Sequence, residues 1–307
     1  MEHKKTLSKN IQADLLLIST SVLWGFAFVA QRVGMKYIGP FTFNGLRFAL
    51  GSLVLLPVIA ILNNGNRPKA DNEPSISIRT AFWGCLLSGL ILFFGASFQQ
   101  VGIVYTTAGK SGFITGLYVI LIPIVGIPLG QRTSPGTWIG AVLAVTGLYL
   151  LSVTKGFTIG KGDLLTLIGS FMWAAHVLAV GWLSPRMNSF ILASSQYAVC
   201  SLLSLAVAIS MENIALSSIL QATIPILYGG VISVGIAYTM QIMAQRVAHP
   251  AHTAVILTME GAFAALGGWL LLGEVLPLRG LFGCALMMAG MLLSQLWVHL
   301  KRSPAGQ

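Results

Sequence analysis

Residues 108–150 read AGKSGFITGLYVILIPIVGIPLGQRTSPGTWIGAVLAVTGLYL, two long apolar runs that are broken only at residues 130–136. Self-similarity at one fixed shift is the mark of an internal repeat. A shift of 143 residues places this stretch on a second copy near the C terminus, in which Ala108 falls on Ala251, Thr115 on Thr258 and Gly140 on Gly283. The sequence therefore predicts two copies of one structural unit.

The starts of the two copies repeat as well, at a shift of 149 residues that places Asp14 on Asp163. The six additional residues lie in a polar segment of the first copy, around residues 63–77. We therefore expect one unit at residues 12–153 and a second at residues 162–300.

Composition places the chain in a lipid bilayer. Of its 307 residues, 55% are hydrophobic and only 8% are charged, and the mean hydropathy is +0.83, whereas soluble proteins carry about a quarter charged residues. The net charge of +10 comes from Lys and Arg in short loops and tails, where membrane topology explains it, so nucleic-acid binding is the weaker interpretation. The cysteines lie inside apolar runs without paired or metal-type spacing, so we expect no disulfide, no metal and no cofactor.

Each apolar run of about 20 residues has to be a helix, because hydrocarbon offers no partner to open backbone groups. The sequence therefore predicts an all-α, polytopic membrane protein with ten transmembrane helices. Their expected ranges are 12–34, 41–62, 79–102, 106–129, 135–153, 162–183, 188–210, 222–246, 250–272 and 277–300.

The placement of Lys and Arg predicts the orientation. With the N terminus in the cytoplasm, the cytoplasmic side holds eleven basic residues and the other side holds six. Cytoplasmic loops carry the excess of basic residues, so both termini are expected inside the cell. Five helices per copy is an odd number, so the second copy enters the membrane from the opposite side and the repeat is inverted. Inverted repeats are typical of transporters that open a midplane site alternately to each side.

Residues 270–293, LLLGEVLPLRGLFGCALMMAGMLL, resemble the end of an EamA domain of the drug/metabolite transporter superfamily. Residues 129–151 carry a weaker version, with Gln131 where the second copy has Glu274, so a carboxylate is not expected to be required at both positions. The remaining matches to this family are the Trp24-Gly25 pair, Arg47 and the Ala237-Tyr238 pair.

This resemblance implies ten helices, a central cavity lined by the first four helices of each copy, and a fifth and tenth helix at the periphery. It also implies a location in the bacterial inner (plasma) membrane and the export of amino acids and other small metabolites.

Glu260 is the first candidate for a functional group, because it is the only acidic residue deep inside a predicted helix. A charge at the bilayer centre costs about 2.5 to 3.5 kcal/mol on insertion scales, so such residues usually face a cavity or a partner. Glu260 is expected to bind a proton or a substrate amine. The alternative is a structural ion pair or hydrogen bond, with Arg47 or His176 as the partner.

Two helices present aromatic side chains at helical spacing. Trp24, Phe28 and Gln31 form one stripe with a polar end, and Trp173 lies one turn before His176. Aromatic walls with a few polar groups suit a small amphipathic solute. The alternative for the stripe is ordinary helix packing, and His176 is either a proton relay or a hydrogen-bonded, neutral packing residue.

Further polar residues complete the set of candidates for the cavity. Arg47 is a candidate for binding a substrate carboxylate bidentately, although it could equally hold helices together or reach the interface, and Asn44 shares its face. The neutral hydrogen-bonding candidates are Gln100, Tyr238 and Gln241.

Lys110 lies near a helix start, with Thr115 and Tyr118 at helical spacing. These residues could line the outer mouth of the cavity, or Lys110 could be an interfacial lysine that reaches toward water. A phosphate-binding loop is rejected here, because that motif needs a glycine where Val104 stands.

The sequence thus favours a secondary transporter that exports small metabolites such as amino acids by alternating access. Its closest alternative is a proton-coupled multidrug efflux transporter. An enzyme is not expected, because paired carboxylates and nucleophile motifs are missing, and a channel is disfavoured by the two-fold repeat. The expected partners are a small-molecule substrate, the lipid bilayer and a proton as the candidate coupling ion, with the choice between monomer and homodimer left open.

Overall fold

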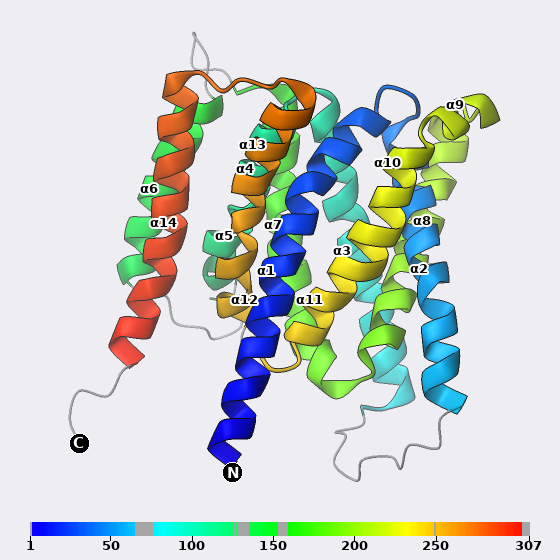
Figure 1. Ribbon diagram of the computed structural model, residues 1–307, viewed down its shortest axis with the longest axis horizontal. Coiled ribbons are helices and arrows are strands. Elements are labelled where there is room, and N and C mark those ends of the chain that lie inside the picture. Colours follow the sequence, from blue (N-terminus) through cyan, green and yellow to red (C-terminus); the bar gives the residue numbers. More distant parts are fainter. Residues whose placement is uncertain are drawn as a thin grey trace.

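The computed structural model describes the backbone of residues 2–64, 76–125, 127, 135–152, 159–248 and 250–302. Every regular element in these ranges is a helix, and no strand is present among them (Figure 1). In the first half of the chain the helices are α1 (Glu2–Gly34), α2 (Pro40–Asn64), α3 (Ile78–Val104), α4 (Ala108–Thr115), α5 (Tyr118–Val125) and α6 (Pro135–Ser152).

The second half contains the matching series. It consists of α7 (Lys161–Leu183), the short 3₁₀ helix η2 (Ser184–Arg186), α8 (Ser189–Met211), α9 (Leu216–Gln221), α10 (Thr223–Leu227), the π-helix η3 (Tyr228–Tyr238), α11 (Thr239–Ala244), α12 (Pro250–Leu257), α13 (Met259–Leu272) and α14 (Leu278–Arg302).

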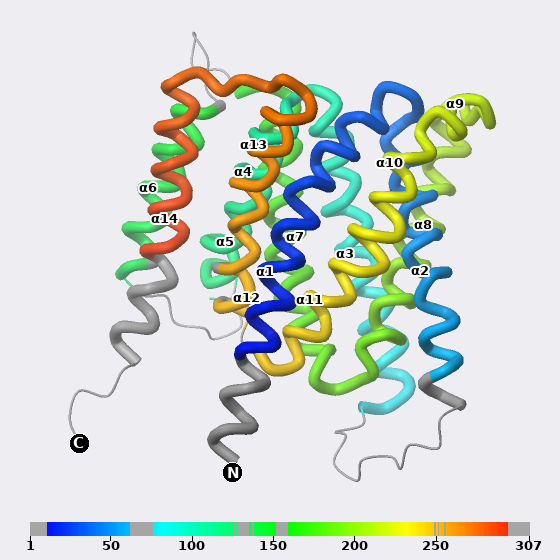
Figure 2. The backbone as a smooth tube through the Cα atoms, in the orientation of Figure 1, coloured from blue at the N-terminus to red at the C-terminus, as the bar shows by residue number. Residues whose placement is uncertain are grey.

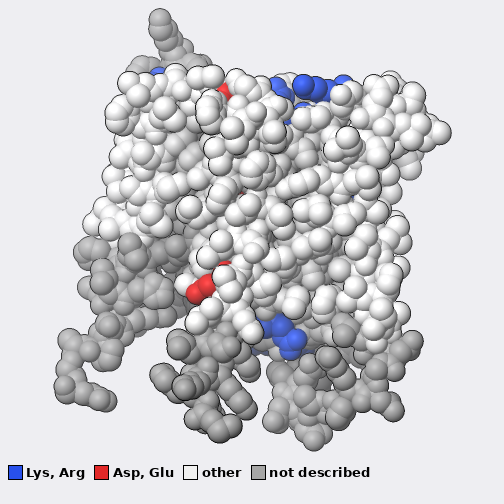
Figure 3. All heavy atoms as spheres, viewed as in Figure 1, with Lys and Arg blue, Asp and Glu red and all other residues white. Residues whose placement is uncertain are grey.

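Eight helical stretches in the described part of the chain are long and apolar enough to cross a membrane. Two shorter apolar helices, Trp138–Leu151 and Leu278–Leu293, lie in α6 and α14. The chain is therefore a multi-pass membrane protein, and its reading as ten crossings in an inverted repeat stays a prediction. Figure 3 shows one face of the molecule, on which the charged atoms lie toward the two ends with a wide uncharged band between them. This distribution agrees with a location in a bilayer.

Three helices that were predicted to be continuous are interrupted. The helix expected at 106–129 begins at Ala108 and breaks after Thr115, and the helix expected at 250–272 breaks at Thr258. At these points the backbone tightens to i→i+3 hydrogen bonds, from Leu117 N to Ile114 O and from Gly261 N to Thr258 O, both 3.2 Å long. Because the 143-residue shift places Thr115 on Thr258, the two copies break at neighbouring positions of the repeat. Figure 2 shows α12 and α13 continuing along one line in spite of the break.

The third interruption is the π-helix η3, which occupies the middle of the helix expected at 222–246. A π-turn adds a residue to each i→i+5 hydrogen-bonded ring, so it changes which side chains face a neighbour without ending the helix. The hydrophobic pattern does not reveal this change, because η3 remains an almost continuous apolar run.

The most extensive helix contacts all join the first half of the chain to the second. They pair α6 with α14, α2 with α8, α3 with α7, and α13 with both α1 and α4. The pair of α6 and α14 lies along one edge of the bundle (Figure 1). Its two backbones approach closely, since a Cβ atom added at Gly290 would lie only 2.5 Å from the carbonyl oxygen of Gly140.

Candidate functional site

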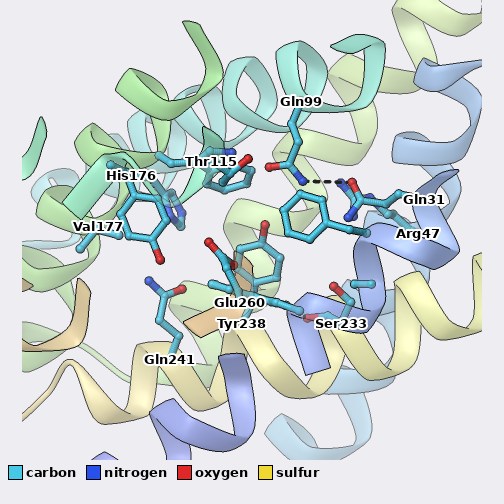
Figure 4. A pocket seen from close by; sticks show the side chains of 15 residues that line it. Gln31, Arg47, Gln99, Thr115, His176, Val177, Ser233, Tyr238, Gln241 and Glu260 are labelled. Carbon is cyan, nitrogen blue, oxygen red and sulfur yellow. Dashed lines mark hydrogen bonds between the residues drawn. The ribbon is translucent and has the colours of Figure 1, made fainter. Parts of the chain in front are cut away.

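A buried cavity lies at the centre of the bundle, with walls from both halves of the chain (Figure 4). The lining residues are Trp24, Ala27, Phe28, Gln31, Arg47, Gln99, Thr115, Tyr118, Trp173, His176, Val177, Ser233, Tyr238, Gln241 and Glu260. The cavity has a volume of about 30 Å³, which is room for only a few water molecules. Pockets for small ligands are about ten times larger, so this conformation encloses the site rather than opening it.

Aromatic rings form the main wall of the cavity. The ring centroids of Trp24 and Tyr238 are 4.3 Å apart, and those of Trp173 and Tyr238 are 6.0 Å apart. The indole of Trp24 also donates a hydrogen bond of 3.3 Å to the carbonyl oxygen of Ser233 in η3. This wall therefore connects α1 of the first half with η3 and α7 of the second.

Glu260 lies in the first turn of α13, directly after the break at Thr258. Its side chain is buried, and its Oε1 atom has no hydrogen-bond partner. The phenol of Tyr118, at the start of α5, lies beside it. A carboxylate is favoured at this place by the partial positive charge of a helix N terminus. The sequence offered Arg47 and His176 as structural partners of Glu260, but His176 Nε2 instead contacts Oε1 of Gln196, at 2.9 Å.

Arg47 is almost completely buried at 1% exposure, and its guanidinium also faces the cavity. Its Nε donates to Oδ1 of Asn44 at 3.0 Å, and its central carbon lies 4.8 Å from the ring centre of Phe48. One terminal nitrogen, Nη2, has no hydrogen-bond partner. No ion pair joins Arg47 to Glu260, although both residues are described. The cavity is thus lined by one carboxylate and one guanidinium group, which do not form an ion pair with each other.

Amide side chains line the rest of the cavity. Gln99 Nε2 donates to Oε1 of Gln31 at 3.1 Å, close to Arg47 in Figure 4. Gln241 lies toward the opposite side of the view and donates to Oε1 of Gln245 at 3.0 Å. The pair of Gln241 and Gln245 retains capacity for an additional hydrogen bond, because the Oε1 atom of Gln241 is buried without a partner and can accept a hydrogen bond.

The structure brings together nine of the eleven candidate residues that the sequence indicated. Around the cavity lie Trp24, Phe28, Gln31, Arg47, Trp173, His176, Tyr238, Gln241 and Glu260. The other two do not line it. Asn44 accepts the hydrogen bond from Nε of Arg47, and Gln100 donates to the backbone oxygen of Gln31 at 3.4 Å. A role in binding stays a prediction for all eleven.

Six lining residues were not among these candidates. Gln99 replaces its neighbour Gln100, since adjacent residues on a helix point about 100° apart and the rotation of α3 was unknown. Thr115 and Tyr118 were expected at an outer mouth with Lys110, whereas they lie at the cavity. The other three are Ala27, Val177 and Ser233, for which the sequence offered no signal beyond the apolar runs that contain them.

No metal centre accompanies the cavity in the described ranges, because they contain no group of three or more His, Cys, Asp or Glu side chains that could hold an ion. The described cysteines, Cys85, Cys200 and Cys284, are buried and unpaired.

The sequence profile of the EamA-like transporter family matches residues 11–153 and again residues 160–296. The chain belongs to the EamA-like transporter family. An uncharacterized transporter of Archaeoglobus fulgidus is 29% identical to it over 94% of this chain and 88% of the relative. The uncharacterized transporter YoaV of Bacillus subtilis is 19% identical over 92% of this chain and 97% of the relative. A protein crystal structure has the same fold, with a TM-score of 0.65 and 18% identity over 95% of this chain and 99% of that one.

In this EamA-like transporter the Leu-Gly-Glu turn has a clear structural role. Gly273 ends α13 in the left-handed conformation, with φ of 65°, which glycine adopts readily. The carboxylate of Glu274 then accepts hydrogen bonds from the backbone N–H groups of Ala108 at 2.9 Å and Gly109 at 3.2 Å. It therefore caps α4 from the other half of the chain. The corresponding Gln131 lies outside the described residues.

Proposed function

We propose that this EamA-like transporter is a secondary transporter that exports small metabolites such as amino acids by alternating access through the central cavity. The observation that carries the proposal is the pair of buried, opposite charges, Glu260 and Arg47, which line one cavity without pairing with each other. On this proposal the ten predicted helices form two inverted halves in a bacterial inner membrane, with both termini in the cytoplasm.

A zwitterionic substrate fits these two charges best. A buried ionic group that lacks a partner is costly, so a ligand that supplies the partner gains affinity from it. An ammonium group would complement Glu260, and a carboxylate would complement the free Nη2 of Arg47. A purely cationic or purely anionic solute would satisfy only one of the two groups.

The aromatic wall supports binding of the apolar part of such a substrate. Trp24, Trp173 and Tyr238 offer flat, weakly polar surfaces against which a side chain of an amino acid can pack. The room around them is too small for an amino acid in the present conformation. Transport therefore requires the halves to move apart, which suits an alternating-access cycle.

Coupling to protons is part of the proposal, with Glu260 as the coupling group. A carboxylate that exchanges a proton for a substrate ammonium links the two fluxes at one site. No catalytic step is proposed, because the described lining of the cavity has a single carboxylate and therefore no pair of carboxylates for acid and base catalysis.

Proton-coupled multidrug efflux is the second candidate. The aromatic rings favour it, because they accept apolar solutes of varied shape. The buried guanidinium of Arg47 weighs against it, since a cationic drug would meet a like charge in the same cavity.

Counterflow of radiolabelled amino acids into proteoliposomes, at two internal pH values, tests the proposal. We expect pH-dependent uptake by the native protein and loss of uptake in Glu260→Gln and Arg47→Gln. The matched control is Arg186→Gln, which removes an arginine that lies over Trp182 outside the cavity and should keep native uptake.

Substrate analogues test the two charges separately. The methyl ester of a transported amino acid lacks the anion, and its N-acetyl derivative lacks the cation. Each should compete at least about tenfold more weakly than the parent, since removing one member of a buried charge pair costs about 2 kcal/mol or more. Equal uptake by native protein and Glu260→Gln would contradict the role of the carboxylate. Uptake of unrelated dyes without uptake of any amino acid would favour drug efflux.

A further inference from the structure

Two contacts between acidic and basic side chains join the halves of the chain away from the cavity. Lys110 Nζ of α4 lies 2.6 Å from Oδ2 of Asp163 at the start of α7. His252 Nε2 of α12 lies 2.7 Å from Oδ1 of Asp14 in α1. We call the first the α4 contact and the second the α12 contact. In each, an aspartate of one half holds a basic residue of the other half.

The internal repeat relates the two contacts to each other. The shift of 149 residues places Asp14 on Asp163, and the shift of 143 residues places Lys110 next to His252, on Thr253. Lys110 is the third residue of α4, and His252 is the third residue of α12. The same pairing of helix starts therefore occurs twice, once with each half supplying the aspartate.

The two contacts lie at opposite ends of the bundle. Arg32, near the end of α1, donates to the carbonyl oxygens of Ile103 and Val104 at the end of α3. The end of α1 therefore lies near the start of α4, which follows α3 in the chain. Asp14 is 18 residues before Arg32 on the same helix, which is roughly 27 Å at 1.5 Å per residue. Figure 1 shows the same arrangement, since the chain descends from α4 to α5 and ascends from α12 to α13.

Each contact holds the outer end of a short helix whose inner end reaches the cavity. The helix α4 runs from Ala108 to Thr115, a lining residue, and α12 runs from Pro250 to Leu257, just before the break that precedes Glu260. Both helices have eight residues and end at the repeated break. A tilt of either helix about its break would open one end of the cavity and leave the other end closed.

The α4 contact is the more strongly held of the two. The side chain of Asp163 is 3% exposed, and it also accepts a hydrogen bond of 2.5 Å from Thr106. Glu274 adds its two hydrogen bonds to the first turn of α4. The side chains of Asp14 and His252 are 41% and 38% exposed, so less of the surrounding protein holds this contact in place. The α12 end should therefore open more readily.

We propose that α4 and α12 are the two gates of the cavity, each locked at its outer end by the aspartate of the opposite half. The proposal rests on the proposed transport function, since it describes how access to the same cavity is regulated. Both contacts are closed in this structure, which agrees with the small free volume around Glu260. Opening one end requires its contact to break while the other contact holds.

Side-specific labelling of a cavity cysteine tests the two gates without any substrate. The reporter is Ser233→Cys in a background without Cys85, Cys200 and Cys284, and the probe is a membrane-impermeant methanethiosulfonate added to inside-out or right-side-out vesicles. Asp163→Asn should speed labelling from the α4 side, and Asp14→Asn should speed it from the α12 side. We expect changes on the order of tenfold, a common size for coupling between conformational states.

Matched variants distinguish a specific effect on labelling from general unfolding of the protein. Lys110→Met breaks the α4 contact but keeps the bond between Thr106 and Asp163, so it should act like Asp163→Asn. The control is Lys161→Met, which removes a lysine that lies over the ring of Tyr105 at the same end and should leave labelling unchanged. Exchange of the charges, with Lys110→Asp and Asp163→Lys combined, should restore slow labelling.

Two results would overturn the proposal that α4 and α12 are gates. One is labelling that rises equally from both sides when a single contact is removed, and the other is native labelling in every variant. Because the probe needs no transported solute, these results stand even if counterflow finds no amino-acid uptake. The labelling experiment can therefore reject the gate proposal independently of whether the counterflow experiment rejects the proposed transport function.

Discussion

Glu260 and Arg47 show how single residues define the centre of this molecule. Each would cost about 2.5 to 3.5 kcal/mol at the centre of a bilayer on insertion scales, and both are buried at the wall of the same cavity. Phe43 and Phe48 lie against the Arg47 guanidinium. Two side chains that are costly at the centre of a bilayer therefore line the same cavity.

Glu274 supplies a prediction at the same scale. Glu274→Ala removes the acceptor of two backbone N–H groups of α4, so it should lower the free energy of unfolding by about 1 kcal/mol, as loss of a helix cap does. The measurement is the thermal unfolding midpoint in detergent, which should fall by about 2 °C. Glu274→Gln keeps an oxygen acceptor and should cost less. An equal loss in both variants would contradict the capping role.

At the scale of elements, interrupted helices determine what the cavity contains. The breaks after Thr115 and at Thr258 bring Tyr118 and Glu260 to the cavity wall, and η3 adds Ser233 and Tyr238. By contrast, α6 and α14 contribute no lining residue and pack on each other through small residues. The helices that line the cavity are therefore different from the pair, α6 and α14, that packs at the edge of the bundle.

The close contact of α6 and α14 leads to a prediction for two glycines of one helix. A Cβ atom at Gly290 would lie 2.5 Å from Gly140 O, whereas a Cβ atom at Gly280 meets nothing nearer than 3.5 Å. Gly290→Ala should therefore destabilise by about 1 to 3 kcal/mol through overpacking. Gly280→Ala should be neutral or stabilise by up to about 1 kcal/mol, because alanine favours a helix. Unfolding midpoints of the two variants, measured side by side, check the difference, and equal midpoints would refute it.

At the scale of the whole molecule, neither half is a complete unit. All of the most extensive helix pairs, and the walls of the cavity, join one half to the other. The two gate contacts do the same at both ends. The halves thus share one core, although each repeats the pattern of the other.

Separate expression of the halves tests this shared core. Residues 1–155 or 156–307 produced alone should be degraded or aggregate, because their large inter-half faces are left exposed. Co-expression of both pieces should restore a stable complex that elutes at the size of the intact protein. Stable monomers of either piece alone would show that the halves fold independently.

The sequence by itself determined the membrane class, the all-helical fold and nine of the residues that line the cavity. It could do so because hydrocarbon forces apolar runs into helices and makes every buried polar group conspicuous. Only the tertiary structure decided that Gln99 rather than Gln100 lines the cavity, and that Glu260 pairs with neither Arg47 nor His176. Only it placed the helix breaks, the π-helix, and the contact of Lys110 with Asp163. These features depend on how each helix is rotated and tightened against its neighbours, and inter-helix packing sets that rotation, not the local sequence.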